Sequence, residues 1–411
     1  MKERPDLRSP QTPAGVEIHQ LAAEPDVPAC HVYMEAQVFT PDSRLVVLHR
    51  SAHAHGSDPA DPEHRYLACD LESGGTLWPL TGEAGATAPA VSPDGTALYY
   101  FVDQTTVGGG RLLLRRVGLD GSGRETLLVL DGPVPGTRYR FSRPYPLSTI
   151  SADGARLGLS GFLGDGRCAG APWGLLVFEL GTGTVQLILE GPSWCNVHPQ
   201  FCRSMDPRER RDLLVQENHG NRCDAWGRCQ QLTGGAGADI HVMRDDGTDR
   251  RDLPWGRDGN EFCQGHQCWV GHTTRAITST GMRQPPGACL IAGRAAPAAG
   301  HRGRATPAGW RCDLTRQIQR PDFHHFATDA GGRRLITDSG PQGTGGGVWL
   351  ARLPQDEAAP LCDLTFLLGP RSSWAKGAHI HPFLSPDGRR GFFNSDESGV
   401  LQPYMVQGWG D

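Results

Sequence analysis

A four-residue turn motif recurs along the chain and constrains the fold more than any other feature. Clear copies occupy residues 40–43, 92–95, 151–154 and 385–388 (TPDS, SPDG, SADG and SPDG), and weaker copies lie near Asp206, His272 and Asp329. The copies are roughly 50 to 65 residues apart, and each precedes an apolar segment such as LVVLHR or RGFFNS. Most units also contain a further strand with its own turn. Units of about four strands repeated at this period are typical of a β-propeller.

We therefore predict an all-β fold, a single seven-bladed β-propeller domain over residues 1–411. The abundance of turn residues, with 55 glycines and 32 prolines, fits many short strands. The seventh unit is one strand short, whereas residues 16–21 resemble the outermost strand of a blade. We expect this N-terminal strand to complete the last blade and close the ring, which removes exposed sheet edges. Residues 1–14 are expected to be disordered or to form an extended arm.

The overall charge excludes some classes of partner. A net charge of −5 and a pI of about 6.3 indicate neither a nucleic-acid nor a membrane partner. The sequence has no signal-peptide pattern and no apolar run long enough to span a membrane, so we expect a cytoplasmic protein. No feature specifies the oligomeric state.

The cysteines are scattered, and in the cytoplasm most of them should be reduced. One group of four flanks His266: Cys223, Cys229, Cys263 and Cys268. Thiolates with this spacing could hold a structural zinc ion, although the spacing is looser than the usual zinc motif. Buried reduced thiols are the alternative.

Histidines recur at one position of the repeat. His379 and His381 are two residues apart on a predicted strand, so both imidazoles project from one face, as a metal ion requires. Side chains at nearly the same place in other units are His31, Tyr145, His198, His266 and His324 or His325. The innermost strands of a propeller begin at one mouth of its channel, so we expect these side chains to converge. Several buried imidazoles are costly to desolvate unless a metal or an anion satisfies them, which predicts a metal site.

The chain also resembles a known family. Shared features are Cys30-His31 followed by Tyr33, Gln37, Phe39 and Thr40; His198-Pro199; His266 followed by Trp269; and Ser373-Trp374 before HIHP, Phe393, Ser395 and Asp396. In these it resembles the oligogalacturonate lyases, seven-bladed propeller polysaccharide lyases. The resemblance implies metal-dependent β-elimination of short uronate oligosaccharides.

The resemblance also implies a set of metal ligands. Carried over, they are His266, His379 and His381, and the cation is expected to be Mn²⁺, with Ca²⁺ or Zn²⁺ as alternatives. The family has a glutamine ligand where this chain has Lys376, and an ammonium group cannot coordinate a cation. Gln264 or water could replace that ligand. Lys376 could instead meet a substrate carboxylate, or it could be a solvated loop residue.

Further residues are candidates for catalysis and substrate binding. His198 is the expected base, with His219 as its substitute, and Tyr145 or water would protonate the leaving oxygen. Arg143 and Arg222 are candidate carboxylate clamps, because a guanidinium group matches a carboxylate with two hydrogen bonds. His31 and His325 are expected to contact substrate at the mouth of the channel.

Two alternatives remain open. The chain could be a propeller lyase for another acidic glycan, such as ulvan or rhamnogalacturonan fragments. It could also be a non-catalytic binding propeller or uronate sensor like the C-terminal part of TolB, which has similar SPDG repeats; the histidine set favours an enzyme. Residues 49–65 carry four further histidines, His49, His53, His55 and His64, in a segment expected to be a solvent loop or to overhang the channel.

Overall fold

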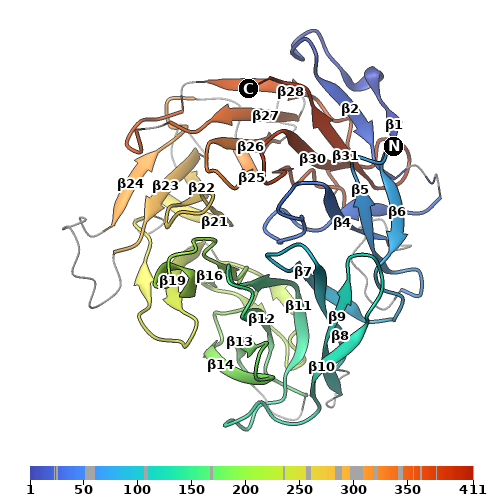
Figure 1. Cartoon of the computed structure of the whole chain (residues 1–411). Coiled ribbons are helices and arrows are strands. Elements are labelled where there is room, and N and C mark those ends of the chain that lie inside the picture. Colours follow the sequence, from blue (N-terminus) through green and yellow to red (C-terminus); the bar gives the residue numbers. More distant parts are fainter. Residues whose placement is uncertain are drawn as a thin grey trace.

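The computed structural model is built almost entirely of β-strands (Figure 1). Strands β1 to β31 and two short 3₁₀ turns, η1 (Pro5–Leu7) and η2 (Glu209–Arg211), are the regular elements of the described chain. The described residues are 1–22, 24, 26–50, 61–105, 110–166, 170–234, 237–255, 261–282, 289–296, 309–318, 323–340, 346–354, 356–361, 363–375 and 377–410. None of the helical segments in these ranges is long and apolar enough to cross a membrane. The predicted all-β fold is confirmed.

Three four-stranded antiparallel sheets follow one another in the first half of the chain. The first contains β3 (Ala29–His31), β4 (Leu45–Arg50), β5 (Arg65–Asp70) and β6 (Thr76–Pro79). The second contains β7 (Ala86–Val91), β8 (Ala97–Gln104), β9 (Arg111–Gly118) and β10 (Glu125–Leu130). The third contains β11 (Ser142–Ile150), β12 (Arg156–Phe162), β13 (Trp173–Glu179) and β14 (Thr184–Gly191).

The next two repeats form one continuous sheet of eight strands. Its first half is β15 (Gln200–Phe201), β16 (Asp212–Asn218), β19 (Ala238–Arg244) and β20 (Arg251–Asp252). Its second half is β21 (Glu261–Trp269), β22 (Ala276–Met282), β23 (Cys289–Arg294) and β24 (Trp310–Asp313). A single pairing between Ala238 and Cys263 joins the halves. A separate hairpin, β17 (Arg222–Cys223) and β18 (Cys229–Gln231), is inserted between β16 and β19.

Two sheets remain, and the last of them includes strands from both ends of the chain. One contains β25 (Phe323–Thr328), β26 (Arg334–Ser339), β27 (Gly347–Arg352) and β28 (Leu364–Leu368). The other has the order β1 (Lys2–Glu3), β2 (Glu17–Gln20), β31 (Gln402–Gln407), β30 (Arg390–Ser395) and β29 (Phe383–Leu384). The pairing of β2 with β31 places an N-terminal strand on the C-terminal sheet, as expected for residues 16–21.

Residues 1–14, expected to be disordered or extended, are held against this last sheet. Strand β1 pairs with β2, and Leu7 is buried in the main hydrophobic cluster. Arg4 forms an ion pair with the buried carboxylate of Glu397 at 2.7 Å. These contacts connect the first residues to the end of the chain.

The repeated turn motif has a common local structure. The Ser92 hydroxyl donates to the Asp94 carboxylate at 2.5 Å, and the Ser385 hydroxyl donates to Asp387 at 2.6 Å. Gly95 and Gly388 follow with φ values of +71° and +70°, a left-handed conformation that glycine adopts without strain. These local bonds explain why the motif marks the end of each innermost strand.

Turns of neighbouring repeats also contact one another. The backbone N–H of His272 donates to Ala330 at 3.2 Å, and that of Ala330 donates to Pro386 at 3.0 Å. The backbone N–H of Asp387 donates to the hydroxyl of Ser43 at 3.1 Å, which links the last repeat to the first. In Figure 1 the sheets accordingly surround a common centre.

Burial decreases from the centre outwards. Every residue of β7, on the inner edge of its sheet, is buried, whereas most of β10, on the outer edge, is exposed or half-buried. The apolar core therefore lies between neighbouring sheets, and the innermost strands enclose the centre. This position makes the starts of the innermost strands the natural location for a site.

Candidate functional site

A cavity of about 690 Å³ lies where the innermost strands begin. Its lining includes nine histidines: His31, His49, His64, His198, His266, His324, His325, His379 and His381. The described residues that line it include no aspartate, glutamate, lysine or arginine. An anionic ligand would therefore meet imidazoles, hydroxyls and amides without a facing carboxylate.

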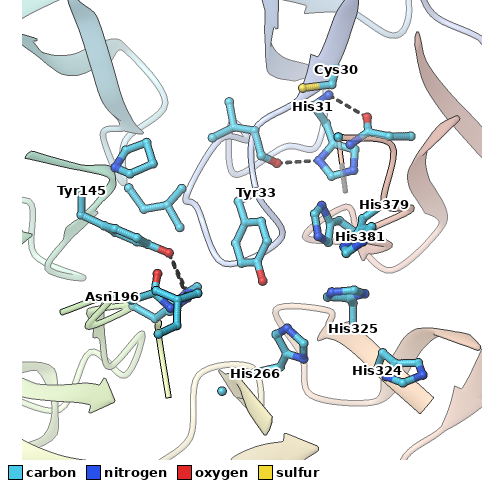
Figure 2. A pocket seen from close by; sticks show the side chains of 18 of the residues that line it. Cys30, His31, Tyr33, Tyr145, Asn196, His266, His324, His325, His379 and His381 are labelled. Atoms are coloured by element: carbon cyan, nitrogen blue, oxygen red, sulfur yellow. Dashed lines mark hydrogen bonds between the residues drawn. The ribbon is translucent and has the colours of Figure 1, made fainter. Parts of the chain in front are cut away.

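Three of these imidazoles form a compact cluster on one side of the cavity (Figure 2). His325, on β25, meets His379 and His381 from the segment before β29, and their ligand nitrogens lie within 4.8 Å of one another. The ring centroids of His325 and His381 are 4.4 Å apart, with the rings edge to face. Three imidazole nitrogens at this separation match the usual ligand set of a transition-metal ion.

A buried carboxylate orients His325. Oδ2 of Asp338, on β26, lies 2.8 Å from Nδ1 of His325, and its Oδ1 accepts the backbone N–H of the same residue at 2.8 Å. Asp338 is completely buried. A carboxylate on Nδ1 fixes the tautomer that leaves the lone pair on Nε2, an arrangement that commonly supports metal-ligating histidines.

His266 and Gln264 lie beside this cluster. The His266 and His325 ring centroids are 4.4 Å apart, and both residues line the cavity with Gln264. Oε1 of Gln264 is buried and has no hydrogen-bond partner among the described residues. A buried carbonyl oxygen that faces a cavity without a partner is suited to accept from a ligand or to bind a cation.

Burial favours the neutral form of His381 and His266. It lowers the pKa of His381 well below its usual value, and the neighbouring histidines lower this pKa further. The pKa of His266 is lowered in the same way, by burial first and by His325 second. Neutral imidazoles have the lone pair that a cation needs, so the residues present fit a divalent metal.

The opposite wall holds a chain of hydrogen bonds. Nδ1 of His198 lies 2.8 Å from Oε2 of Glu35, and the Tyr145 hydroxyl lies 2.9 Å from Nε2 of the same ring (Figure 2 shows Tyr145). The Glu35 side chain is only 3% exposed. Burial raises the pKa of Glu35, and the adjacent His198 opposes that shift. A proton can pass from the Tyr145 hydroxyl to Nε2 of His198 along this hydrogen bond.

Tyr33 lies between the two walls. Its ring centroid is 4.7 Å from that of His381 and 5.5 Å from that of His198. Burial raises the pKa of Tyr33 well above its usual value, and the charge of Glu35 adds to this effect. The phenol therefore stays protonated and can donate a proton.

His31 completes the lining near His381. Its Nδ1 lies 2.5 Å from the carbonyl of Val32, while its Nε2 is buried without a hydrogen-bond partner among the described residues. Burial lowers the pKa of His31 to about 4. His31 is therefore a neutral group available to a ligand in the cavity.

The backbone is strained at this site. His198 and His381 have φ values of +48° and +47°, and Asn196 and Trp374, which also line the cavity, have values of +57° and +56°. Non-glycine residues rarely adopt this conformation, and such residues concentrate at functional sites. His198 and His381 thus reach the cavity from short, strained segments that precede β15 and β29.

Comparison with solved structures shows a close likeness in fold to two oligogalacturonate lyases. One, in complex with manganese, is 18% identical, with a TM-score of 0.70 over 99% of this chain and 96% of that chain. The other, from Vibrio parahaemolyticus, is 14% identical, with a TM-score of 0.67 over 96% and 94% of the two chains. The β-propeller domain of the Trilobed protease from Pyrococcus furiosus is 11% identical, with a TM-score of 0.52 over 93% and 96%.

These matches confirm the predicted resemblance: the chain has a β-propeller fold like that of the oligogalacturonate lyases over nearly its whole length. At such identities the likeness shows the fold. No family model matches the sequence, and no curated protein matches it either.

Several residues singled out in the sequence lie away from the cavity. His219 pairs with Asp239 at 2.9 Å and is not part of the cavity lining. Arg143 donates to the carbonyl of Trp226 and lines a separate pocket, while Arg222 is exposed on the β17–β18 hairpin. In this structure, none of these three side chains therefore lies where it could contact a ligand in the cavity. Lys376, His53 and His55 lie outside the described residues.

The prediction that Cys223, Cys229, Cys263 and Cys268 form one metal-binding group is wrong. Cys223 and Cys229 meet Cys195, whereas Cys263 and Cys268 lie on β21 and are buried in two different apolar clusters. The register of β21 shifts between Cys263 and Gln267, and the two thiols pack in separate clusters, so Cys263 and Cys268 do not form one site with the hairpin cysteines. Cys195 is absent from the predicted group because the fold, not sequence spacing, brings it there.

Glu35, Asp338 and Tyr33 were not predicted as site residues. Asp338 had a usable signal, because it is an acidic residue two positions after Ile336 in RLITDS, a segment that follows a turn motif and so predicts a blade strand. The sequence singles out Tyr33 only through the family resemblance. Glu35 follows the first histidine in a segment without regular alternation, and its contact with His198 spans 163 positions.

Proposed function

We propose that this protein is a metal-dependent lyase that cleaves uronate-containing oligosaccharides by β-elimination. One observation supports this most strongly. The imidazoles of His325, His379 and His381 cluster on one side of a cavity whose other side holds His198, bonded to Glu35 and Tyr145. A cation site facing a proton acceptor is the arrangement that elimination next to a carboxylate requires.

The proposed architecture is one domain, a ring of seven blades closed by strand β2. Each half of the eight-stranded sheet would be one blade, and among the described residues their strands pair at Ala238 and Cys263. The hydrogen bond from Asp387 to Ser43 supports contact between the last blade and the first, and the pairing of β2 with β31 supports completion of the last blade by the N-terminal strand. In such a ring, every blade contributes to one central cavity.

The cavity suits an acidic sugar. Its volume of about 690 Å³ lies within the usual range for small-ligand sites. The described lining has no carboxylate to repel a uronate and no arginine to bind one. The substrate carboxylate would therefore be directed to the histidine cluster and its cation.

His325, His379 and His381 would hold the cation, with His266 and Gln264 beside them. We expect Mn²⁺, with Ca²⁺ or Zn²⁺ as alternatives. A bound divalent cation would neutralise the substrate carboxylate and make the adjacent C5 proton more acidic. This proposal adds His325, which the sequence predicts to contact substrate, to the predicted ligand set.

Proton transfer would use the opposite wall. The Tyr145 hydroxyl faces Nε2 of His198, so the C5 proton passes to the Tyr145 oxygen as the phenolic proton passes to His198. Glu35 then stabilises the imidazolium through Nδ1. His198 is thus the final proton acceptor, and Tyr145 is the group that touches C5.

The leaving oxygen also needs a proton. As the C5–H bond breaks, its electron pair forms the C4=C5 double bond and the C4–O bond breaks. Tyr33 is protonated and lies between the two walls, so its phenol can donate to the departing oxygen. Solvent would then return a proton to Tyr33 and take the proton held by His198. The products are an unsaturated uronate and a shortened sugar.

A steady-state assay tests this proposal. Purified protein is supplied with Mn²⁺ and a panel of saturated and unsaturated uronate disaccharides, including digalacturonate and ulvan and rhamnogalacturonan fragments. The proposal predicts ultraviolet absorbance from a 4,5-unsaturated uronate, or a deoxy-keto uronate from an already unsaturated substrate, and loss of activity with a chelator. Turnover of another acidic glycan alone would replace the substrate assignment. Binding without turnover would favour a non-catalytic propeller.

A further inference from the structure

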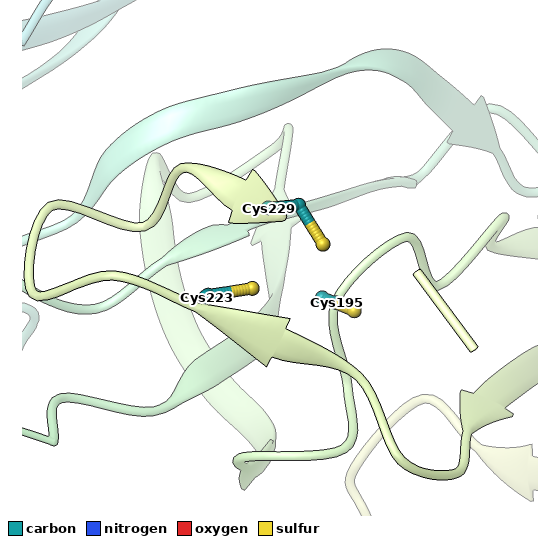
Figure 3. Close-up of side chains that lie close together, drawn as sticks. All are labelled: Cys195, Cys223 and Cys229. Carbon is teal, nitrogen blue, oxygen red and sulfur yellow. The ribbon is translucent and has the colours of Figure 1, made fainter. Parts of the chain in front are cut away.

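Three cysteine side chains meet at the inserted hairpin, away from the histidine cluster (Figure 3). Cys195 precedes β15, Cys223 ends β17 and Cys229 begins β18. Their sulfur atoms lie within 4.8 Å of one another. Cys223 and Cys229 are register partners across the hairpin, so their side chains share the face that meets Cys195.

The loop between the two hairpin cysteines is tightly organised. The Asp224 carboxylate accepts the backbone N–H groups of Trp226 and Arg228, both at 2.9 Å. The backbone N–H of Gly227 donates to the Asp224 carbonyl at 3.0 Å, and Gly227 has a φ of +70°. The loop thus holds the two thiols in a fixed register, as a chelating loop must.

Apolar burial contributes little to the stability of this insertion. Within residues 219–234, all of which the structure describes, only Gly227 is buried. Trp226 and Leu232 are 38% and 50% exposed. Small elements without an apolar core generally need a crosslink or a metal to stay in place.

The same insertion forms part of the cavity wall. Leu232 and Thr233, just after β18, line the cavity, as does Asn196 next to Cys195. The Asn218 side chain donates to the carbonyl of Asn196 at 3.2 Å. Anything that fixes the three thiols therefore also fixes this side of the cavity.

We propose that Cys195, Cys223 and Cys229 bind a structural Zn²⁺ ion as thiolates, with water as the fourth ligand on the exposed side of Cys229. Tetrahedral zinc with Zn–S bonds of about 2.3 Å places sulfur atoms about 3.8 Å apart, a spacing that the observed cluster, with its sulfur atoms within 4.8 Å of one another, accommodates. Burial, and after it the neighbouring Cys229, raises the pKa of Cys223 to about 11, so zinc binding would release thiol protons. The ion would clamp the hairpin against the cavity.

Zinc content and cobalt spectra test this site independently of any sugar chemistry. The measurements are made in a His381→Ala background, so that a cation at the histidine cluster does not contribute. Zinc per protein chain is measured after dialysis for this background and for added Cys229→Ser or Cys312→Ser. Cys312 is a matched control, because its thiol donates to a backbone carbonyl at 3.2 Å outside the cluster and serine keeps that donor.

We expect one zinc per chain in the background and with Cys312→Ser, and at least a tenfold loss with Cys229→Ser. Cobalt-loaded protein should show thiolate-to-cobalt charge-transfer absorption that Cys229→Ser abolishes. Cys229 is exposed, so the substitution should leave the circular dichroism spectrum unchanged. Equal zinc content in the two cysteine variants, no zinc in the background, or a Cys223–Cys229 disulfide found by mass spectrometry would each overturn the proposal.

Discussion

Oε2 of Glu35 lies 2.8 Å from Nδ1 of His198, although 163 positions separate the two residues. The pair is buried, and the other imidazole nitrogen faces the Tyr145 hydroxyl. A carboxylate on one nitrogen holds the ring orientation and stabilises the imidazolium when the other nitrogen takes a proton. Glu35 is therefore a positioning residue for the proposed proton acceptor.

Replacing Glu35 by glutamine should lower kcat about 100-fold, in the range typical of acid–base catalysis, and leave KM nearly unchanged. The amide can still accept a hydrogen bond, but it cannot neutralise an imidazolium. Steady-state kinetics on a uronate disaccharide measure both constants. Glu217→Gln is the matched control, because Glu217 pairs with His241 at 3.2 Å outside the cavity lining. Equal effects of the two substitutions would refute the assigned role.

His381→Ala should abolish retention of the proposed manganese at the histidine cluster while leaving the melting curve nearly unchanged. The substitution removes one of the three converging imidazoles. Elemental analysis of dialysed, manganese-loaded protein provides the measurement. His219→Ala, which removes a histidine outside the cavity lining, should retain the metal. Full manganese retention by the His381 variant would place the ion elsewhere.

Asp338→Asn should weaken metal binding 10- to 100-fold, the usual cost of losing a carboxylate behind a metal-ligating histidine. Asparagine can present an N–H to Nδ1 of His325 and so favour the wrong tautomer. Titration against a competing chelator gives the dissociation constant. Asp239→Asn changes the equivalent carboxylate on His219 and should have no effect on that constant. A normal constant for Asp338→Asn would mean that His325 is not a ligand.

Alanine substitution of Arg143 or Arg222 should change KM for the disaccharide by less than about twofold. Arg143 contacts the carbonyl of Trp226 in a separate pocket, and Arg222 is exposed on the hairpin. Neither side chain lines the cavity. A tenfold or larger rise in KM for either variant would restore its assignment as a carboxylate clamp.

Glu83 should make stability depend on pH in acid. Burial alone would raise the pKa of Glu83, but hydrogen bonds from Tyr100, Gly82 and Arg115 outweigh it and lower this pKa from 4.5 to about 2. A depressed folded-state pKa stabilises the protein above pH 4.5, and this contribution is lost as the pH falls towards 2.

Between pH 6 and pH 3, the unfolding free energy of the wild type should therefore fall by about 2 kcal/mol more than that of the Glu83→Gln variant. Urea unfolding at both pH values measures this difference. The exposed Glu72→Gln variant should keep the wild-type dependence. An unchanged slope for Glu83→Gln would show that its hydrogen bonds do not stabilise the carboxylate form.

The sequence predicts what short-range interactions determine. The Ser92–Asp94 bond spans two residues, so its motif marks the repeats and hence the strands. His379 and His381 do share one cluster, but they precede β29 and are not on the strand that their spacing predicts, and His381 has a φ of +47°. The membership of His325 depends instead on Asp338, which sets the ring orientation across two strands.

The positions of the other site residues depend on long-range contacts and on local backbone conformation. Arg143 has a φ of +46° and bonds to the inserted hairpin, which turns it away from the cavity. The contact of Cys195 with Cys223 and Cys229 depends on how that hairpin folds back. Residue type and repeat position alone do not contain this information.

Product analysis by mass spectrometry distinguishes β-elimination from hydrolysis. Wild-type protein with Mn²⁺ is incubated with saturated digalacturonate, and the masses of the products are compared with that of the substrate. β-Elimination predicts two products whose masses sum to that of the substrate, one of them unsaturated, and their absence with His198→Ala. Products whose masses sum to the substrate plus one water would show hydrolysis, and no product from any uronate disaccharide would contradict the lyase assignment.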